Sequence, residues 1–406
     1  MTHIGIKKEN YQLLGGNDPN KVINENPFEI YNKDTINFLS ILSQELLKNK
    51  KSTKFKDFIG FGFWARKANI LNLRNARKDI NSRIGRGTSF HIAPSNISAN
   101  ALYTFAFGLL SGCPSLIRLS SKNKDELKDI LSLINLITES IQFDALANKF
   151  SFINYDHETN LSSYYSSLVD ARVIWGGDET IQLFKSFKTN PHCIDIVFPN
   201  KVSSSIISGN WLSSSNHSEI RSKADLYSRD IGLFSQMACS SPSNMIFLKD
   251  NKELERKHLL EFFDYCDKSL SKKEWLSEIH STANFKSSVD ICMRLPNIDC
   301  LFKGENISVF LAEKRQFSVI KNYKPKDCCL FLFEANSIEE ASKLLSKNNQ
   351  TIVCIGLKKD LKEKLAKKVM IKGTNRIVSA GNALNMNIFW DGYDIISYLS
   401  KLICLN

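Results

Sequence analysis

One cysteine of this chain lies in a segment unlike those around the other nine. Cys239 stands in Ser-Gln-Met-Ala-Cys-Ser-Ser-Pro (235–242), ringed by small and hydroxyl residues and followed by the apolar run NMIFL. A thiol in an open, polar site can ionise and act as a nucleophile. Most other cysteines fall in apolar runs, which favours reduced, buried thiols. By composition alone, the same interpretation is favoured for Cys239.

A second segment could stabilise negative charge on an oxygen atom. The stretch HIAPSNIS (91–98) lies between a short apolar run and a longer one. The Asn96 amide could donate to a developing oxyanion. Asn96 and Ser98 are also good helix N-cap residues, and Pro94 fixes a turn. From spacing alone, a capped helix start is the favoured interpretation.

A third segment contains two glycines where a strand should give way to a helix. Gly176 and Gly177 follow the apolar run Ala171–Trp175 and precede Asp178. Glycines let a backbone approach a ligand closely, and a helix N-terminus favours phosphate. The segment is not GxGxxG, so by itself it indicates only an ordinary turn between a strand and a helix.

These segments, taken in this order, resemble the acyl-CoA reductase family of the LuxC type. That family is typified by the fatty acid reductase of bacterial bioluminescence and is a distant branch of the aldehyde dehydrogenase superfamily. The resemblance runs from about Gly85 to near the C-terminus, while the first 80 residues match only loosely. It rests on HIAPSN…ALYTFAFGLLSGCPSLIRLSSKN, VIWGGDETI, SQMACSSP and GTNRIVSAGNALNMNIFWDGYD (373–394).

The resemblance implies a role for each motif residue. Cys239 aligns with the catalytic cysteine that forms the acyl-enzyme thioester. Asn96 aligns with the oxyanion-hole asparagine, and the backbone N–H of Cys239 would be the second donor. Arg118 stands where aldehyde dehydrogenases place a lysine near the cofactor ribose and phosphate. Gly176 and Gly177 match the glycine turn beside the pyrophosphate of the nicotinamide nucleotide.

The resemblance also implies a reaction. We expect NADPH-dependent reduction of a fatty acyl thioester to the aldehyde through an acyl-Cys239 intermediate. The acyl donor would be acyl-CoA or an acylated partner enzyme, an acyl-protein synthetase, and the protein would be a homo-oligomer. The alternative is an acyl-accepting, non-reducing subunit of an acyl-protein synthetase complex.

Two motifs of aldehyde-oxidising relatives are missing. Where a Glu-Leu-Gly-Gly-like motif supplies a hydrolytic base, this chain reads HCIDIVFPNK, which favours the reductive direction. His192 and Asp195 lie in that stretch and receive little weight as catalytic groups. The ribose-binding Glu-x-Phe-Gly-Pro motif is also absent. The choice of NADPH over NADH therefore has no support from that motif.

The elements that must position these residues alternate between strands and helices from about residue 87. This alternation predicts an α/β fold with parallel sheets covered on both faces. The resemblance makes it aldehyde-dehydrogenase-like: a Rossmann-like cofactor domain, an α/β catalytic domain and a small oligomerisation element. We predict an N-terminal segment packing on the cofactor domain (1–80), a cofactor domain (81–224), a catalytic domain (225–380) and a C-terminal tail, a possible oligomerisation element (381–406).

The composition of the chain excludes several classes of protein. The chain has 406 residues, 43% of them hydrophobic and 24% charged, which excludes disordered, collagen-like and coiled-coil proteins. The formal net charge of +12 is scattered. It suits NADPH, coenzyme A or an acidic partner, and we expect no nucleic-acid binding. No Cys/His group has zinc spacing, so we predict no metal site. Without a signal pattern or a membrane-spanning run, we expect a cytoplasmic protein.

Overall fold

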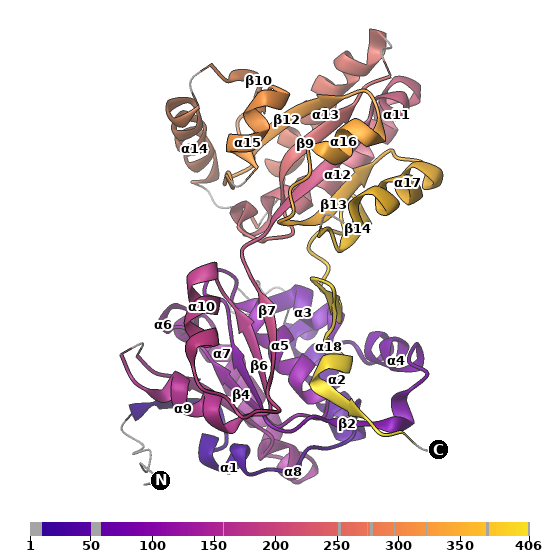
Figure 1. Ribbon diagram of the computed structural model, residues 1–406. Helices are drawn as coiled ribbons and strands as arrows, with labels where there is room; N and C mark the ends of the chain where they lie inside the picture. Colours follow the sequence, from indigo (N-terminus) through magenta and orange to yellow (C-terminus); the bar gives the residue numbers. More distant parts are fainter. Residues whose placement is uncertain are drawn as a thin grey trace. The chain divides into compact units, whose positions relative to one another are not determined.

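In the computed structural model, the chain forms two compact units. Unit 1 comprises residues 1–199 and 386–406, and unit 2 comprises residues 200–385 (Figure 1). The described residues are 10–49, 58–156, 158–250, 253–273, 275–276, 279–295, 297–321, 323–370 and 373–404.

Unit 1 is built on a six-stranded sheet that is parallel except for one edge strand. The antiparallel edge strand is β1, which pairs with β5. β3 is the first parallel strand in the sequence. The chain adds β4 and β5 on one side of it, then β6 and β7 on the other. Across the sheet the order is β1 (Gln12–Gly16), β5 (Phe150–Asn154), β4 (Ser115–Arg118), β3 (Ser89–Ile92), β6 (Ala171–Trp175) and β7 (Ile194–Phe198).

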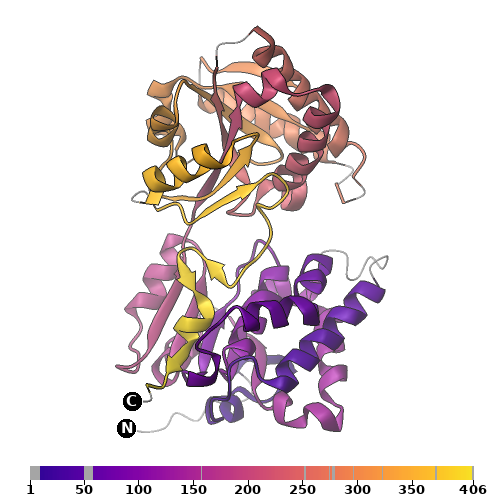
Figure 2. The same cartoon turned by 90° about the vertical axis from the view of Figure 1, so that its right-hand side faces the viewer.

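Helices cover both faces of this sheet (Figures 1 and 2). On one face, Phe38 of α2 packs edge-on against Phe105 of α5 and lies close to Phe150 of β5. On the other, α1, α9 and α10 pack against Phe90 and Ile92 of β3. The helices are α1 (Pro19–Ile23), α2 (Lys33–Lys48), α3 (Ile59–Trp64), α4 (Lys67–Asn75), α5 (Ala99–Leu110), α6 (Ser121–Glu126), α7 (Lys128–Thr138), α8 (Asp144–Ala147), α9 (Leu161–Leu168), α10 (Asp178–Ser186) and α18 (Ile395–Leu399).

The almost wholly apolar α5 is the central helix of unit 1. All but one of its residues are buried, which explains why its sequence shows no polar face. Gly112 ends it at a φ of +75°, and a Cβ there would lie 2.0 Å from the carbonyl oxygen of Phe28. Only glycine fits this turn.

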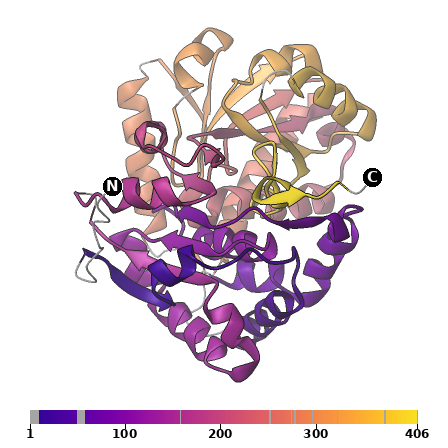
Figure 3. The same ribbon diagram turned by 60° about the horizontal axis from the view of Figure 1, so that its bottom comes forward.

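The C-terminal segment folds back onto unit 1. β17 (Ser400–Leu402) pairs antiparallel with β2 (Arg83–Gly85), and Figure 3 shows the yellow C-terminal strand beside the purple N-terminal part of the chain. β15 (Phe389–Trp390) and β16 (Tyr393–Asp394) form a second small ladder. The Cys113 thiol donates to the carbonyl of Leu399, which also ties this segment to the unit.

Unit 2 contains a seven-stranded sheet whose single antiparallel strand, β10, is again at an edge. β8 and β9 are its central strands. The order is β10 (Asp299–Lys303), β11 (Ser308–Leu311), β12 (Cys329–Ala335), β9 (Pro242–Leu248), β8 (Val202–Ser208), β13 (Asn349–Ile355) and β14 (Arg376–Ser379).

Two separate hydrophobic clusters cover the faces of the unit 2 sheet. Ile207 and Phe247 belong to the cluster with α12 and α13, whereas Ile206 and Ile246 belong to the one with α16 and α17. Neighbouring residues divide in this way because side chains alternate along a strand. The helices are α11 (Gly209–Ser214), α12 (His217–Gly232), α13 (Glu253–Leu270), α14 (His280–Arg294), α15 (Phe317–Ile320), α16 (Ile338–Lys343) and α17 (Lys359–Val369).

The division between the units differs from the predicted domain boundary at residues 224/225. The units divide between Pro199 and Asn200, because β8 hydrogen-bonds to β9 and β13 inside the second sheet. Residues 386–406 belong to unit 1, whereas the predicted tail began at residue 381. The oligomerisation role proposed for that tail stays a prediction.

Among the described residues, no single helix is both long and apolar enough to cross a bilayer. One pair of helical segments, Lys128–Thr138 and Ile141–Ala147, passes on length and composition alone, with a bend of 96° between the two.

Candidate active site

The motif residues of unit 1 follow three neighbouring parallel strands at their carboxyl ends. Ile92 of β3 is in register with Arg118 of β4 on one side and with Ile174 of β6 on the other. Asn96 follows β3, and Gly176 follows β6 directly. The chain also reverses its direction of strand addition at β3, and the crevice beside such a reversal is where open α/β sheets bind ligands. Asn96, Arg118 and Gly176 therefore lie at the carboxyl ends of neighbouring strands in one sheet.

Asn96 lies in the loop between β3 and α5 and is exposed. The loop is held by Asn123 of α6, whose side-chain amide donates to the carbonyl of Pro94. Ser98 is the N-cap residue of α5, as predicted, but its hydroxyl donates to Asn123 and Glu126 and makes no capping hydrogen bond to the helix. The loop is anchored through Pro94 and Ser98, with Asn96 between them.

Arg118 ends β4 as a largely buried side chain, 7% exposed. Its guanidinium lies 5.0 Å from the ring centroid of Tyr155, and one of its nitrogens donates to the Tyr155 carbonyl oxygen at 3.4 Å. Stacking on an aromatic ring suits a planar guanidinium better than a lysine ammonium. This packing gives a physical reason for arginine where aldehyde dehydrogenases place a lysine.

Gly176 and Gly177 form the turn that starts α10. Gly177 is the N-cap residue and brings no side chain to the first turn. A Cβ on Gly176 would lie 2.9 Å from side-chain atoms of Thr180, so the close packing of the turn requires glycine. Asp178 and Glu179 are the first two residues of the helix. Their carboxylates lower the positive potential that a helix N-terminus offers to phosphate.

His91 is a core residue of unit 1. It is fully buried and joins β3 to α5 through a 2.7 Å hydrogen bond with the Thr104 hydroxyl. Its other ring nitrogen is 2.8 Å from the Ser89 hydroxyl. Burial lowers the pKa of His91 to about 3, so the ring is neutral at physiological pH. The residue is structural.

His192 and Asp195 do not form a catalytic pair. Asp195 accepts two hydrogen bonds of 2.7 Å from the guanidinium of Arg172, and His192 is exposed in the preceding turn. Arg172 and Asp195 are in register near the amino ends of β6 and β7, opposite the edge where the motifs gather.

Cys239 lies in unit 2, in the turn that leads into β9. The N–H of Ser241 donates a 3.0 Å hydrogen bond to the carbonyl of Ala238, and this bond closes the turn around Cys239 and Ser240. The Cys239 carbonyl accepts a 2.6 Å hydrogen bond from the Ser203 hydroxyl of β8. The thiol is free and partly exposed. The backbone at Cys239 is thus fixed to the centre of the sheet, while the side chain stays accessible.

The backbone just before Cys239 is strained. Phe234, Ser235 and Gln236 have φ values of 55°, 49° and 63°, in the left-handed region. Each such residue costs roughly 1 kcal/mol or more. The buried Gln236 side chain stabilises the turn by donating to the carbonyls of Pro242 and Cys329 at 2.7 and 3.0 Å. Strain of this kind collects at functional sites.

Buried oxygen atoms flank the same turn. Among the described residues, neither Oε1 of Gln236 nor Oγ of Ser241 has a hydrogen-bond partner. Both side chains are fully buried. Oxygens in this situation are usually completed by water or a ligand. The surroundings of Cys239 are therefore polar, as the hydroxyl-rich sequence indicated.

Lys324 is a neighbour of Cys239 that the sequence analysis did not identify. Its ammonium donates a 2.9 Å hydrogen bond to the carbonyl of Met237, two residues before Cys239. Lys324 and Cys239 are 85 positions apart in the sequence and share no motif, so only the fold shows that they are close.

The other cysteines are less uniform than predicted. Five are buried, but Cys292, Cys300 and Cys404 are exposed and Cys193 is partly buried. Accessibility therefore does not distinguish Cys239. Cys239 is distinguished by its position: it lies before a central strand and just after a strained segment, and a lysine lies beside it.

The first part of the fourth motif (373–394) has a structural role, because its residues hold the backbone of the segment in place. The Arg376 guanidinium donates to the carbonyls of Ala383 and Asn385, both at 3.0 Å. The Asp230 carboxylate accepts from the N–H groups of Gly381 and Ala383. These bonds shape the segment with which the chain leaves unit 2.

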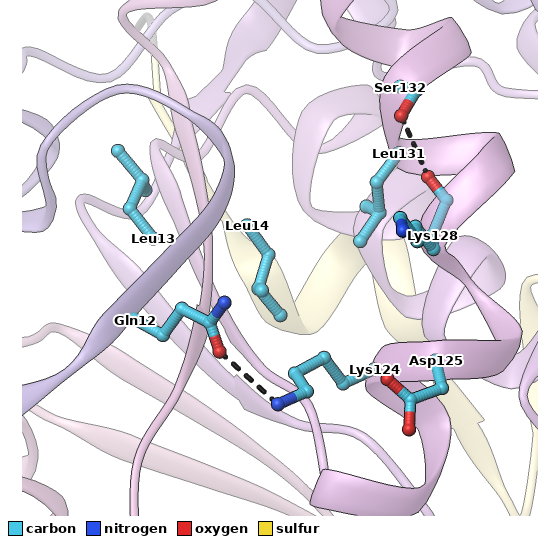
Figure 4. Close-up of a pocket in the computed structure, with 8 residues that line it drawn as sticks. All are labelled: Gln12, Leu13, Leu14, Lys124, Asp125, Lys128, Leu131 and Ser132. Atoms are coloured by element: carbon cyan, nitrogen blue, oxygen red, sulfur yellow. Dashed lines mark hydrogen bonds between the residues drawn. The ribbon is translucent and has the colours of Figure 1, made fainter.

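A cavity elsewhere in unit 1 contains none of the motif residues (Figure 4). It lies between β1 and the helices α6 and α7, where the Lys124 ammonium donates to Oε1 of Gln12 at 3.3 Å. Its lining residues are Gln12, Leu13, Leu14, Lys124, Asp125, Lys128, Leu131 and Ser132.

Sequence comparison relates the chain to thioester reductases. The model of the acyl-CoA reductase (LuxC) family matches residues 27–402. Long-chain acyl-protein thioester reductase 2 of Photobacterium leiognathi is 23% identical over 317 residues, 73% of this chain and 61% of that protein. The long-chain acyl-protein thioester reductase of Aliivibrio fischeri is 24% identical over 335 residues, 78% of this chain and 63% of that protein. The matches thus span about three fifths of these curated relatives' length.

Structural comparison relates both units to aldehyde dehydrogenases. An NAD-dependent benzaldehyde dehydrogenase from Corynebacterium glutamicum superposes with a TM-score of 0.62 at 9% identity, covering 98% of each chain. The glyceraldehyde-3-phosphate dehydrogenase GapN of Methanocaldococcus jannaschii, complexed with NADP, gives 0.62 at 10% identity, covering 91% of this chain and 88% of that one. At such identities the likeness concerns the fold, and the predicted α/β aldehyde-dehydrogenase-like fold is confirmed.

The family match covers both motif-bearing regions, the carboxyl edge of the unit 1 sheet and the Cys239 turn of unit 2. The chain belongs to the acyl-CoA reductase family of the LuxC type.

Proposed function

We propose that this protein reduces a fatty acyl thioester to the aldehyde, with NADPH as the reductant and Cys239 as the acyl-carrying nucleophile. The observation that carries the proposal is the Cys239 turn. A partly exposed thiol is fixed before a central strand, with its carbonyl held by Ser203 and a lysine ammonium bonded two residues away. A thiol presented in this way is suited to nucleophilic catalysis.

The covalent step follows from thiol chemistry. The Cys239 thiolate attacks the carbonyl carbon of the acyl thioester, a new carbon–sulfur bond forms, and the donor leaves as a thiolate that takes up a proton. The oxyanion of this step is stabilised by the backbone N–H of Cys239 and by the Asn96 amide, as the family resemblance implies. After reduction, the aldehyde carbonyl re-forms and expels the Cys239 thiolate.

The cofactor proposal is supported by the edge of unit 1. When bound, NADPH supplies the hydride that reduces the acyl group. Arg118 would hold a phosphate or ribose oxygen, and the Gly176–Gly177 turn would lie beside the pyrophosphate. The side-chain-free N-cap of α10 fits this role, and the carboxylates of Asp178 and Glu179 weaken it. NAD(P) binding agrees with the aldehyde-dehydrogenase-like fold. The preference for NADPH and a cytoplasmic location are proposals.

The acyl donor is proposed to be a coenzyme A thioester or an acylated partner enzyme of the acyl-protein synthetase class. Reductases named for an acyl-protein substrate are among the relatives that the chain matches. Self-association into a homo-oligomer stays a prediction.

The experiment combines acyl labelling with cofactor oxidation. Purified wild-type protein and the Cys239→Ala variant are incubated with radioactive long-chain acyl-CoA, with and without NADPH, and the aldehyde is trapped and identified. The wild type should be labelled, lose the label when NADPH is added and form aldehyde, whereas Cys239→Ala should do none of these. Cys300→Ala, which removes an exposed thiol elsewhere in unit 2, is the control and should behave as the wild type.

Two results would overturn parts of the proposal. Persistent labelling of Cys239→Ala would exclude Cys239 as the nucleophile. Labelling of the wild type without NADPH oxidation, at every chain length tested, would favour the acyl-accepting, non-reducing subunit.

A further inference from the structure

The Lys324 ammonium is bonded to the nucleophile turn from a segment distant in sequence. Lys324 lies in the connection between α15 and β12. Besides its 2.9 Å bond to the Met237 carbonyl, a second contact joins the two segments: the N–H of Asp327 donates to the carbonyl of Ser235 at 3.2 Å. The 324–327 connection thus supports the strained turn at two points just before Cys239.

The charges around this ammonium are few. Burial lowers the pKa of Lys324, and the groups that act on it electrostatically are Cys239 and Lys326. Cys239 favours the ammonium form of Lys324, and Lys326 disfavours it. The nearest carboxylate along the chain, Asp327, accepts a hydrogen bond from the Ser287 hydroxyl. Asp290, which accepts from the neighbouring Tyr323, also accepts from Arg294.

Among the residues that the structure describes, no carboxylate is bonded to the Lys324 ammonium. Such a partly buried ammonium is costly, since burial disfavours its charge. Its hydrogen bond to a neutral carbonyl compensates only in part. The group that would compensate further is an anion at Cys239, because attraction between a thiolate and an ammonium is mutual. The buried charge of Lys324 is therefore unfavourable while Cys239 is a neutral thiol, and it becomes favourable when Cys239 ionises to the thiolate.

We propose that Lys324 is a positioning residue that stabilises the Cys239 thiolate and fixes the turn that presents it. This inference rests on the proposed function, in which Cys239 is the nucleophile. It adds a residue that the family motifs do not contain, and it explains why the nucleophile turn is bonded to a lysine side chain.

The test measures the reactivity of the Cys239 thiol directly. In a Cys292→Ser/Cys300→Ser/Cys404→Ser background, the rate of alkylation by iodoacetamide is followed between pH 5 and 10 by mass spectrometry of the Cys239 peptide. An opposite charge near an ionisable group favours its charged form. We therefore expect Lys324→Met to slow alkylation at pH 7 about tenfold and to move the pH midpoint upward, with the rate at pH 10 largely restored.

Two further variants separate charge from structure. Lys324→Arg keeps the positive charge and should keep the midpoint near that of the wild type. Lys326→Met removes an equal charge from an exposed side chain two residues away and should change the rate at pH 7 by less than about twofold. If Lys324→Met does not fold, as judged by circular dichroism, Lys324→Gln takes its place with the same expectation.

An unchanged alkylation profile in a folded Lys324→Met or Lys324→Gln variant would overturn the inference. So would an equal shift in Lys326→Met, which would show a general effect of charge. Alkylation needs neither acyl donor nor NADPH, so it measures the effect of Lys324 on the Cys239 thiol independently of the proposed reaction. Failure of the proposed function would appear separately, as wild-type protein that is not acylated at Cys239.

Discussion

The backbone N–H of Ala93 donates a 3.1 Å hydrogen bond to the carbonyl of Arg118. This bond extends the pairing of β3 and β4 by one step, so the loop that carries Asn96 starts directly beside the last residue of β4. Asn96 and Arg118, which are separated in sequence by the whole of α5, are thereby brought to the same end of the sheet.

Replacement of Asn96 by alanine should impair acyl transfer. Loss of one oxyanion donor typically lowers kcat by about 10²- to 10³-fold. Single-turnover acylation of Cys239 and steady-state aldehyde formation should both fall, with little change in thermal stability because the Asn96 side chain is exposed. Ser95→Ala, at the neighbouring exposed position, is the control. An Asn96→Ala variant that acylates at the wild-type rate would refute the role.

Replacement of Arg118 by methionine should weaken cofactor binding. A hydrogen bond to a charged group contributes about 1.5–3 kcal/mol, so the Kd for NADPH should rise roughly tenfold to a hundredfold. Fluorescence titration with NADPH and NADH measures this loss for each cofactor. Lys122→Met, which removes an exposed cation from α6, should leave the Kd unchanged. Equal Kd values for Arg118→Met and wild type would place the cofactor elsewhere.

Neutralising the first residue of α10 should strengthen cofactor binding. Asp178 places a carboxylate at the helix end proposed for the pyrophosphate, so Asp178→Asn removes a repulsion. We expect the Kd for NADPH to fall by a few fold, with the larger effect at low ionic strength. Asp144→Asn, at the start of α8, is the matched control. A higher Kd in Asp178→Asn would argue against the pyrophosphate site.

Alanine at Gly108 should destabilise unit 1 even though it raises helix propensity. A Cβ at this position in α5 would lie 2.2 Å from the Ser115 hydroxyl and 3.0 Å from a ring nitrogen of His91. Overpacking of this kind costs about 1–3 kcal/mol. At Gly60 in α3 the nearest atom, the Tyr103 hydroxyl, is 3.9 Å away, so Gly60→Ala should be neutral or stabilising by up to about 1 kcal/mol. Urea unfolding of the two variants measures the difference.

The stability of unit 1 should fall on acidification because of His91. Its pKa is lowered from 6.5 to about 3 in the folded state, so between these values only the unfolded chain binds the proton. The free energy of unfolding therefore falls by about 1.4 kcal/mol for each pH unit below 6.5, so that at pH 5 it is lower by about 2 kcal/mol. His91→Gln should lose less stability than the wild type between pH 7 and pH 5, as measured by urea unfolding at each pH. Equal losses would refute the assignment.

The alternating pattern of apolar runs was enough to predict most parallel strands. The apolar run Ala171–Trp175, for example, has the same bounds as β6 in the structure. Strands buried on both faces are continuously apolar, which makes them visible in a single sequence. Helices such as α9 and α14 are harder to see in a single sequence because polar and apolar residues are mixed along them.

The sequence by itself determined the family, the fold class and the motif residues, because those residues are local and lie in an order that can be read along the chain. The tertiary structure decided what each residue contacts. It brought Arg118 onto Tyr155, placed Lys324 beside the Cys239 turn and moved the unit boundary to residue 199. These relationships depend on strand order and on side chains far apart in sequence. Contacts of this kind are set by packing between elements and leave no periodic signal in any one of them.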